Sequence, residues 1–460
     1  MGFVFYDLET TGLDPKFDQI LELAAIRTDG EYRELERLHV KCRLRPHIIP
    51  SIKALSINGF SIDRCTDEHL HSHYEMMRRV NDTFLSWSPS IFVGWNSISF
   101  DEEFLRFAFY QSLTDAFLTS RHGNARLDLM WAAGAILKFS PDALRPAFTD
   151  EGNLSLALER VAAANGVSEH RAHDAISDTE AMVQLAGSMR NNARSFWSQA
   201  LRMSKKSNAR AVLETGEPFV LTEVFSGRID QYVVVPLRPD PADTTGNRWI
   251  CADLDRDFSR FANMSDAEAV EWLTTSPRPL RSVKVNRSPM ILPLEELDEF
   301  NGIDTEDYAD RSDTIRDTCE TAGRAVALFS AATQPSFENS ELEQQLYERL
   351  CDESQWHFIN RFHELPWAER LHHIKRIPDR RYQRLGLRLI AEHAPEVLDD
   401  DTRARSDQWI KGRFDTDLTP SVWRTKRSAR QEAHSFQLER PDTDDEELCK
   451  TYIRFIESLP

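Results

Sequence analysis

The amino-acid sequence predicts an α/β domain over residues 1–193, a small β-containing domain over residues 194–338 and an α-helical domain over residues 339–460. Three observations predict this organisation. The chain has 460 residues, which is enough for about three domains. Apolar runs with strand and helix spacing alternate in the first part, and short apolar runs between Pro, Gly and Asp clusters follow. Charged amphipathic helical patterns dominate the last part, and residues 334–340 have the composition of a linker.

The first domain is expected to begin with a strand, because residues 3–6 (FVFY) form a compact apolar run that ends at turn residues 11–15. Three further apolar runs predict strands over residues 19–28, 38–44 and 91–95. Helical spacing of apolar residues predicts helices over residues 100–111, 154–164 and 175–189. Five short runs predict strands in the second domain, at residues 219–224, 232–237, 249–252, 282–285 and 290–292. Four prolines interrupt the helical pattern of the third domain: Pro366, Pro378, Pro395 and Pro420.

Composition and charge exclude several classes of protein. Hydrophobic residues make up 41% of the chain and aromatic residues 10%, which excludes wholesale disorder. The 56 basic and 75 acidic residues give a net charge of −19, which argues against a protein that coats nucleic acid nonspecifically but allows a nucleic-acid enzyme with local basic surface. The six cysteines are scattered singly, as in reduced cytoplasmic proteins. With no leader or membrane-spanning run expected, the sequence predicts a cytoplasmic protein without a membrane partner.

Two carboxylates stand at the end of the first predicted strand. Because strand side chains alternate, Asp7 and Glu9 project from one face and Leu8 from the other. Two carboxylates held this closely repel each other unless a cation lies between them, and hard oxygen ligands select Mg²⁺ or Mn²⁺. Taken alone the pair is weak evidence, because a solvated strand end explains most such pairs.

Two later segments add acidic residues and a histidine. Asp101 is expected at the start of a helix after the strand at 91–95, where the simpler interpretation is a helix cap. Asp174 is expected to cap the helix that contains Asp178, and His173 precedes Asp178 by five residues. If His173 lies in the entering loop, it and Asp178 can face one cleft. A surface histidine beside a helix is the simpler alternative for His173.

Together these residues form one pattern, in the order Asp7, Glu9, Asp101, His173 and Asp178. The pattern resembles the DEDD exonucleases of the histidine subtype, which have an RNase H-like fold. That resemblance implies an enzyme that binds two divalent ions through these carboxylates and removes nucleotides from 3′ ends.

A wider set of motifs resembles the bacterial exodeoxyribonuclease I family. These motifs are residues 5–12 (FYDLETTG), 24–29 (AAIRTD), 94–96 (GWN), 100–103 (FDEE), 164–166 (ANG), 172–175 (AHDA), 284–289 (KVNRSP) and 345–347 (QLY). The resemblance implies an exonuclease domain, an SH3-like middle domain and a helical C-terminal domain. It also implies processive 3′ to 5′ degradation of single-stranded DNA to 5′-mononucleotides, in DNA repair and recombination.

The resemblance assigns a role to each residue of the pattern. Asp7 would contact both of two Mg²⁺ ions, for which Mn²⁺ can substitute, while Glu9 and Asp178 would each contact one. Asp101 would bind directly or through water. The remaining residue, His173, suits a general base because an unperturbed histidine has a pKa near 6.5.

A DNA exonuclease with this net charge needs local positive surface, and three basic segments could bind phosphates. They are residues 202–210, 278–287 and 365–388, and the candidate DNA-binding residues in them are Lys205, Lys206, Arg210, Lys284, Arg287, Arg380, Arg381 and Arg384. A solvated helix face is an equally good interpretation of each segment. Trp95 and Phe100 are candidates for base stacking but could equally be core residues.

The resemblance also implies a partner, the acidic C-terminal tail of single-stranded DNA-binding protein. Pro293, Glu295 and Glu296 stand where polar or basic groups would suit such a tail, so the residues do not support this partner individually. A monomer is expected. Three alternatives stay open: a 3′–5′ exoribonuclease or proofreading subunit, a nuclease recruited into phage defence, and a non-catalytic protein that binds 3′ ends. Intact acidic residues at all four positions argue against the last.

Overall fold

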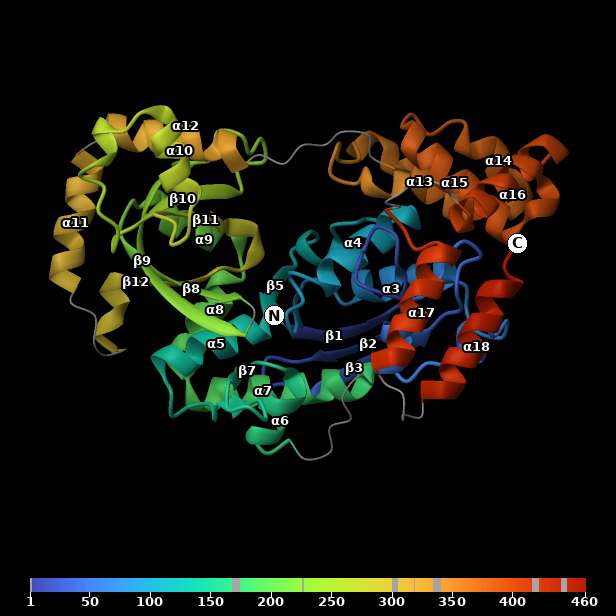
Figure 1. The fold of residues 1–460 in the computed structure, drawn as a ribbon, viewed down its shortest axis with the longest axis horizontal. Coiled ribbons are helices and arrows are strands. Elements are labelled where there is room, and N and C mark those ends of the chain that lie inside the picture. Colours follow the sequence, from blue (N-terminus) through green and yellow to red (C-terminus); the bar gives the residue numbers. More distant parts are fainter. Residues whose placement is uncertain are drawn as a thin grey trace.

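The computed structural model describes residues 2–167, 174–225, 227–299, 305–317, 319–333, 341–415, 422–439 and 445–460. It contains an N-terminal α/β domain, a middle domain built on a β-sheet and a helical C-terminal domain, as the sequence predicts. Figure 1 shows the middle domain (green to yellow) and the C-terminal domain (orange to red) at opposite ends of the N-terminal domain. Within the described residues, no helix is long and apolar enough to cross a membrane.

The N-terminal domain is built on a five-stranded sheet in the order β3-β2-β1-β4-β5. Its central strand β1 pairs antiparallel with β2 and parallel with β4, and β4 pairs parallel with β5. The strands are β1 (Gly2–Thr10), β2 (Ile20–Thr28), β3 (Glu34–Lys41), β4 (Ser90–Gly94) and β5 (Ala125–Asp128). The third strand therefore begins and ends earlier than the predicted range 38–44.

Alternation along β1 decides where the acidic residues lie. Val4, Tyr6 and Leu8 belong to a core shared with α3 and α4 on one face of the sheet. On the other face, Phe3 and Phe5 belong to a core shared with α5 and α7. Asp7 and Glu9 continue the second series, so their side chains lie on the face covered by α7.

Helices cover both faces of this sheet. They are α1 (Ile52–Ile57), α2 (Ile62–Thr66), α3 (His73–Ser86), α4 (Asp101–Gln111), α5 (Leu129–Phe139), α6 (Leu158–Ala164) and α7 (Ala175–Asn192). The predicted helix over 154–164 is wrong at its start, because β7 (Leu154–Ser155) pairs with β6 (Ala147–Phe148) in a small hairpin. The pairing satisfies backbone groups that a helix would otherwise bond internally.

The middle domain contains a second five-stranded sheet, in the order β11-β10-β9-β8-β12. Its antiparallel strands fall on the five predicted runs: β8 (Phe219–Phe225), β9 (Arg228–Pro239), β10 (Arg248–Asp253), β11 (Leu280–Lys284) and β12 (Met290–Pro293). The α-helices described in this region are α8 (Arg194–Met203), α9 (Lys206–Glu214), α10 (Asp266–Thr274), α11 (Thr305–Asp317) and α12 (Cys319–Thr333). Residues of α10 and α12 share one core with the sheet.

The C-terminal domain packs on the N-terminal domain in two places. Its helices are α13 (Trp356–Glu364), α14 (Trp367–Ile374), α15 (Arg380–His393), α16 (Asp400–Phe414), α17 (Lys426–Glu439) and α18 (Asp445–Ser458). Residues of α13 to α15 join the core of α3 and α4, whereas residues of α17 and α18 join a core with α1 and α2. Pro366, Pro378 and Pro395 lie between α-helices, as predicted, with Pro395 at the start of a short 3-10 helix, and Pro420 lies outside the described residues.

Candidate active site

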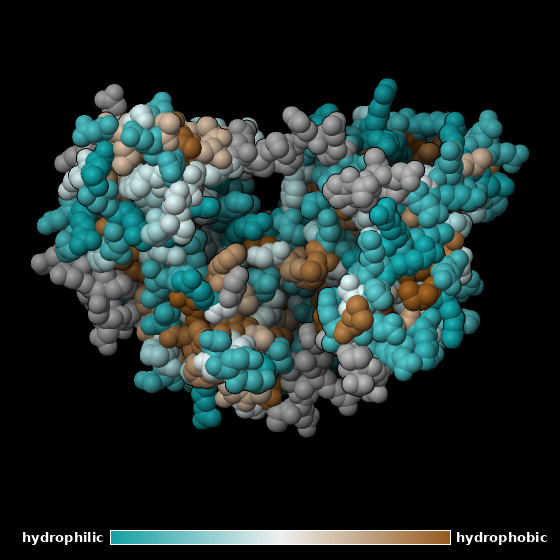
Figure 2. Space-filling model, in the orientation of Figure 1, coloured by the Kyte–Doolittle hydropathy of each residue, from teal (hydrophilic) through white to brown (hydrophobic). Residues whose placement is uncertain are grey.

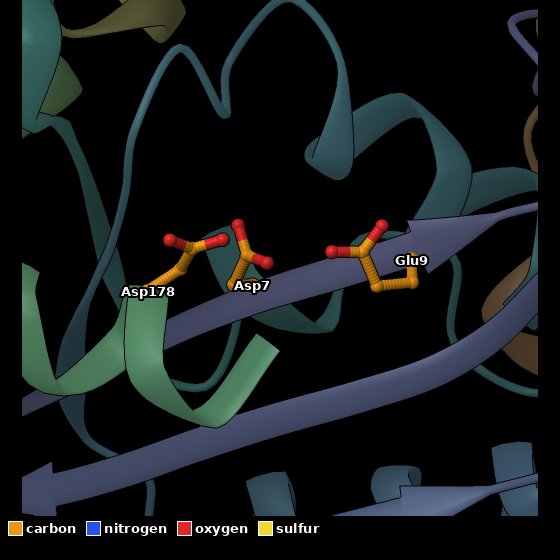
Figure 3. A group of neighbouring side chains, drawn as sticks. All are labelled: Asp7, Glu9 and Asp178. Carbon is orange, nitrogen blue, oxygen red and sulfur yellow. The ribbon is translucent and has the colours of Figure 1, made fainter. Parts of the chain in front are cut away.

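Three of the predicted site residues come together at the surface of β1. Each of Asp7, Glu9 and Asp178 offers a carboxylate oxygen within 4.8 Å of the other two. Asp7 and Glu9 project from β1, and Asp178 projects from the first turn of α7. Figure 3 shows the three carboxylates on the same side of the strand, with Asp178 beside Asp7.

Asp101 joins this group from the first residue of α4 and is buried. The helix-cap interpretation does not describe it, because Phe100 is the N-cap residue and no side chain caps this helix. Instead, backbone N–H groups of Leu8 and of Asp101 itself stabilise its carboxylate. Asp101 therefore connects the start of α4 to the strand that carries Asp7 and Glu9.

The electrostatics of the group favour a bound cation. Burial raises the pKa of Asp7 well above its ordinary value, and Asp101, Asp178 and Glu9 raise it further. Burial and the neighbouring carboxylates raise the pKa of Glu9 to about 9. Burial raises the pKa of Asp101 to about 8, against the effect of its backbone hydrogen bonds. A cluster of buried carboxylates that repel one another fits hard divalent cations, which oxygen ligands select.

The segment before α7 bears on the remaining catalytic candidate. His173 lies outside the described residues. Asp174 caps α7 by accepting a hydrogen bond of 3.2 Å from the Ser177 N–H, which confirms the predicted cap. Asp178 follows in the first helical turn, where its side chain reaches Asp7.

Sequence reasoning missed Asp128, which supports the site from the end of β5. The Asp128 carboxylate accepts hydrogen bonds from the backbone N–H groups of Asn96, at 3.0 Å, and Ile98, at 3.1 Å. It also caps α5 through the Trp131 N–H, and burial raises its pKa to about 7. Asp128 thereby fixes the loop that leads from β4 to Asp101. The available signal was an aspartate directly before an apolar run, the pattern of a helix start.

Glu102, which belongs to the motif at residues 100–103 but was not predicted as a site residue, connects several elements beneath the site. Its carboxylate accepts hydrogen bonds from Thr119, at 2.5 Å, Arg126, at 2.8 Å, and the Tyr6 hydroxyl, at 3.3 Å. Burial opposes its ionisation, but Arg126 and Arg106 outweigh this effect, so the pKa of Glu102 is lowered. Glu102 therefore stays ionised and holds the first turn of α4 against β1.

A cavity of about 1090 Å³ lies over the carboxylates. Asp7, Glu9, Asp101 and Asp178 line it, as do both aromatic candidates, Trp95 and Phe100. The indole N–H of Trp95 donates to the Leu156 carbonyl at 2.8 Å, and the Phe100 ring packs against Phe104. Both aromatic rings are therefore held by the fold and also border the cavity. Figure 2 shows the molecule hollowed between the two end lobes.

The basic candidates of the middle domain lie on its surface and outside the residues that line this cavity. Lys205 and Lys206 are exposed at the start of α9. Arg210 donates to the Gly246 carbonyl at 2.6 Å. Lys284 is exposed at the end of β11, and Arg287 forms an ion pair of 3.6 Å with Glu103 in the first turn of α4.

The three basic candidates of α15 occupy different environments. The guanidinium of Arg381 binds the Asp379 carboxylate at 2.7 Å and donates to the backbone carbonyls of Gln345 and Arg349. Arg380 and Arg384 are exposed on α15, and neither forms an ion pair within the described part of the chain. Of the three, Arg380 and Arg384 are available to a ligand, whereas Arg381 connects α15 to the segment before α13.

Comparisons with known proteins agree with this architecture. Residues 4–186 match a family model described as exonuclease, and residues 204–331 match one described as exonuclease I SH3-like domain. The chain is 26% identical to exodeoxyribonuclease I of Haemophilus influenzae over 433 residues, which is 90% of each chain. It is 26% identical to exodeoxyribonuclease I of Escherichia coli over 364 residues, 75% of each.

Solved structures show the same fold. Escherichia coli exonuclease I in complex with a dA16 oligonucleotide superposes with a TM-score of 0.87 at 22% identity, over 100% of both chains. Exonuclease I of Methylocaldum szegediense gives a TM-score of 0.87 at 23% identity, over 99% of this chain and 100% of that one.

Proposed function

We propose that this chain, which carries an exonuclease domain followed by an exonuclease I SH3-like domain and is similar to exodeoxyribonuclease I over most of its length, is a 3′–5′ exonuclease of single-stranded DNA. The protein is a nuclease. The observation that carries the proposal is the group of Asp7, Glu9 and Asp178 inside the exonuclease domain. Support for the substrate comes from the relatives named exodeoxyribonuclease I and from the structures of Escherichia coli exonuclease I with dA16 and dT13 oligonucleotides.

The donor set fits divalent metal ions, because buried carboxylates offer hard oxygen ligands and repel one another without a cation. Asp7, Glu9 and Asp178 would hold two Mg²⁺ ions, or Mn²⁺ in their place, with Asp101 binding directly or through water. When bound, these ions supply positive charge that stabilises the phosphate and lowers the pKa of water. A related structure is described as the zinc-bound form of Escherichia coli exonuclease I with single-stranded DNA.

The chain's own residues would orient the substrate and move the proton. Asp128 and Glu102 hold the loop and helix that present Asp101. His173 would accept the proton of the attacking water as a general base. The water oxygen would bond to the phosphorus of the terminal nucleotide while the bond from that phosphorus to the 3′ oxygen of the preceding nucleotide breaks, which releases a 5′-mononucleotide and leaves a protonated 3′-hydroxyl on the shortened strand. DNA repair and recombination are the proposed setting.

One assay tests this proposal. Purified protein is incubated with end-labelled single-stranded DNA, duplex DNA and RNA of one sequence, with Mg²⁺ or with EDTA. Stepwise loss of 3′ nucleotides from single-stranded DNA, with Mg²⁺ alone, is expected. Equal activity in EDTA would contradict the metal assignment, and a preference for RNA would contradict the substrate.

The proposed partner remains the C-terminal tail of single-stranded DNA-binding protein. Pro293, Glu295 and Glu296 line a second cavity of about 680 Å³ together with Arg202. Arg202 forms an ion pair with Glu296, so an acidic tail would have to displace that carboxylate. Titration with a labelled tail peptide tests this partner, and Glu296→Gln should strengthen binding because it removes the competing charge.

A further inference from the structure

A hairpin of the middle domain reaches the candidate active site. Its strands β8 and β9 meet at Phe225 and Arg228. Gly227, Arg228, Ile229 and Asp230 line the same cavity as the four carboxylates of the N-terminal domain. Figure 1 shows this hairpin extending from the middle domain toward α5 and β7. Two domains therefore contribute walls to one cavity.

A glycine in α5, Gly134, lets the hairpin pack closely against this helix. A Cβ at Gly134 would lie 2.7 Å from Val224 Cγ2 and 3.5 Å from Ile229 Cγ1, so only glycine admits these side chains so closely. Asp128 caps the same helix and also holds the loop before Asp101. The hairpin packs on α5, and the cap residue of α5, Asp128, also holds the loop before Asp101. This arrangement fixes the position of the hairpin relative to the carboxylates.

The opposite face of the hairpin is open. Phe225 and Arg228 are directly paired across the ladder, so their side chains project from the same face, whereas Val224 and Ile229 project toward α5. Phe225 is 79% exposed and the Arg228 side chain is 78% exposed. An exposed guanidinium that lines the cavity therefore lies beside an exposed aromatic ring on the same face of the hairpin.

The two side chains match the chemistry of a single strand of DNA. Unstacked bases bind aromatic rings, and phosphates bind guanidinium groups. Arg228 pairs with Asp230 at 3.3 Å, but an exposed pair of this kind is weak and a phosphate can replace it. Leu13 and Ile57 of the N-terminal domain also line the cavity and expose apolar side chains. Apolar side chains that could contact bases are therefore exposed within the cavity itself.

From this geometry we propose that the β8–β9 hairpin positions the DNA strand for cleavage, with Phe225 stacking on one nucleobase and Arg228 binding a backbone phosphate. The inference rests on the proposed function, because it assumes a single-stranded DNA substrate.

Binding and cleavage of oligonucleotides by Phe225→Ala and Arg228→Gln test the proposal. Exposed residues elsewhere provide matched controls, Leu438→Ala on α17 and Arg260→Gln in the middle domain. In EDTA, where cleavage stops, Phe225→Ala should raise the Kd for a single-stranded oligonucleotide roughly tenfold. Arg228→Gln should reduce the slope of log affinity against log salt by about 0.7, the loss of one phosphate contact. Neither control should change either quantity.

A second measurement identifies the stacked base. A series of oligonucleotides carries one abasic nucleotide at successive positions from the 3′ end. At one position the wild type should lose affinity and the difference between wild type and Phe225→Ala should disappear. A difference that persists at every position, or wild-type binding by both variants, would overturn the inference. A wild type that neither binds nor cuts single-stranded DNA would instead refute the proposed function.

Discussion

The environment of α15 separates two kinds of arginine, and substitution can distinguish them. The Arg381 side chain is 11% exposed and Asp379 is 7% exposed, and the two form an ion pair with further hydrogen bonds to backbone carbonyls. Replacing Arg381 with glutamine leaves the Asp379 carboxylate nearly buried without its cation. We expect Arg381→Gln to lower the free energy of unfolding by roughly 2–4 kcal/mol.

Arg380 and Arg384 should behave in the opposite way, because both are exposed and neither forms an ion pair within the described residues. If they bind phosphates of the DNA strand at a distance from the active site, the double variant Arg380→Gln/Arg384→Gln should keep the free energy of unfolding of the wild type. The slope of log affinity against log salt should fall by about 1.4, from two contacts of about 0.7 each. Long substrates should also be released after fewer cuts, whereas cleavage of very short oligonucleotides should stay nearly unchanged.

Urea unfolding measures stability, and fluorescence anisotropy from about 50 to 300 mM salt measures the salt dependence of affinity. Cleavage in the presence of a trap for released enzyme measures processivity. Lys53→Gln serves as a control, since Lys53 is an exposed basic residue whose ion pair among the described residues is with Glu439 at the surface. An unchanged salt slope and unchanged processivity in the double variant would remove α15 from the DNA path. Wild-type stability of Arg381→Gln would refute the structural role of its ion pair.

Three further predictions concern the site and its support, and a fourth concerns His363, a histidine of α13 that hydrogen-bonds Tyr74 and the Leu113 carbonyl. Asp7→Asn should abolish Mg²⁺-dependent cleavage, and the rise in melting temperature that Mg²⁺ gives the wild type should disappear; full activity would exclude Asp7 as a shared ligand. His173→Ala should lower the single-turnover rate by roughly 10²-fold while leaving DNA affinity intact, and an unchanged rate would make it a bystander. Asp128→Ala should cost about 1–3 kcal/mol in urea unfolding and also lower kcat, because the loop before Asp101 loses its acceptor; an effect on stability alone would limit Asp128 to a structural role. Burial lowers the pKa of His363 to about 3 in the folded protein, whereas the unfolded chain takes up this proton near pH 6.5. The contribution of His363 to the free energy of unfolding is therefore present above about pH 6.5 and is lost as the pH falls toward 3. The free energy of unfolding of His363→Gln should depend less on pH across that window, and an equal pH dependence would contradict this.

The sequence predicted four of the five strands of the N-terminal sheet and missed β5, and it placed the acidic residues of β1 correctly because alternation along a strand is a local property. Phe3 and Phe5 face one core and Val4 and Tyr6 face the other, and the same alternation places Asp7 beside Glu9. The fold then brings Asp178 to them, as the predicted pattern requires. The assignment of roles to these residues stays a prediction.

Other features depend on contacts between distant segments, which a local pattern does not contain. The helix over 129–139 escaped prediction because it is apolar on nearly every side, so it lacks the spacing of an amphipathic helix. The support given by Glu102 arises from Tyr6, Thr119 and Arg126, which come from three other parts of the N-terminal domain. Neither spacing nor composition distinguishes Arg381, which is paired, from its exposed neighbours on α15.

The docking of α17 and α18 on α1 and α2 has a consequence for the order of folding during synthesis. Leu21, Ile52 and Leu55 share one hydrophobic core with Phe436, Tyr452 and Ile456. The Tyr452 hydroxyl donates to the Pro50 carbonyl at 2.7 Å, across 402 positions of the chain. Contacts this distant in sequence form late, and apolar surface on the first domain stays open to water until the last helices emerge from the ribosome. A polypeptide that stops after the exonuclease domain should therefore aggregate or be degraded, so a truncated translation product would not release a free nuclease into the cell.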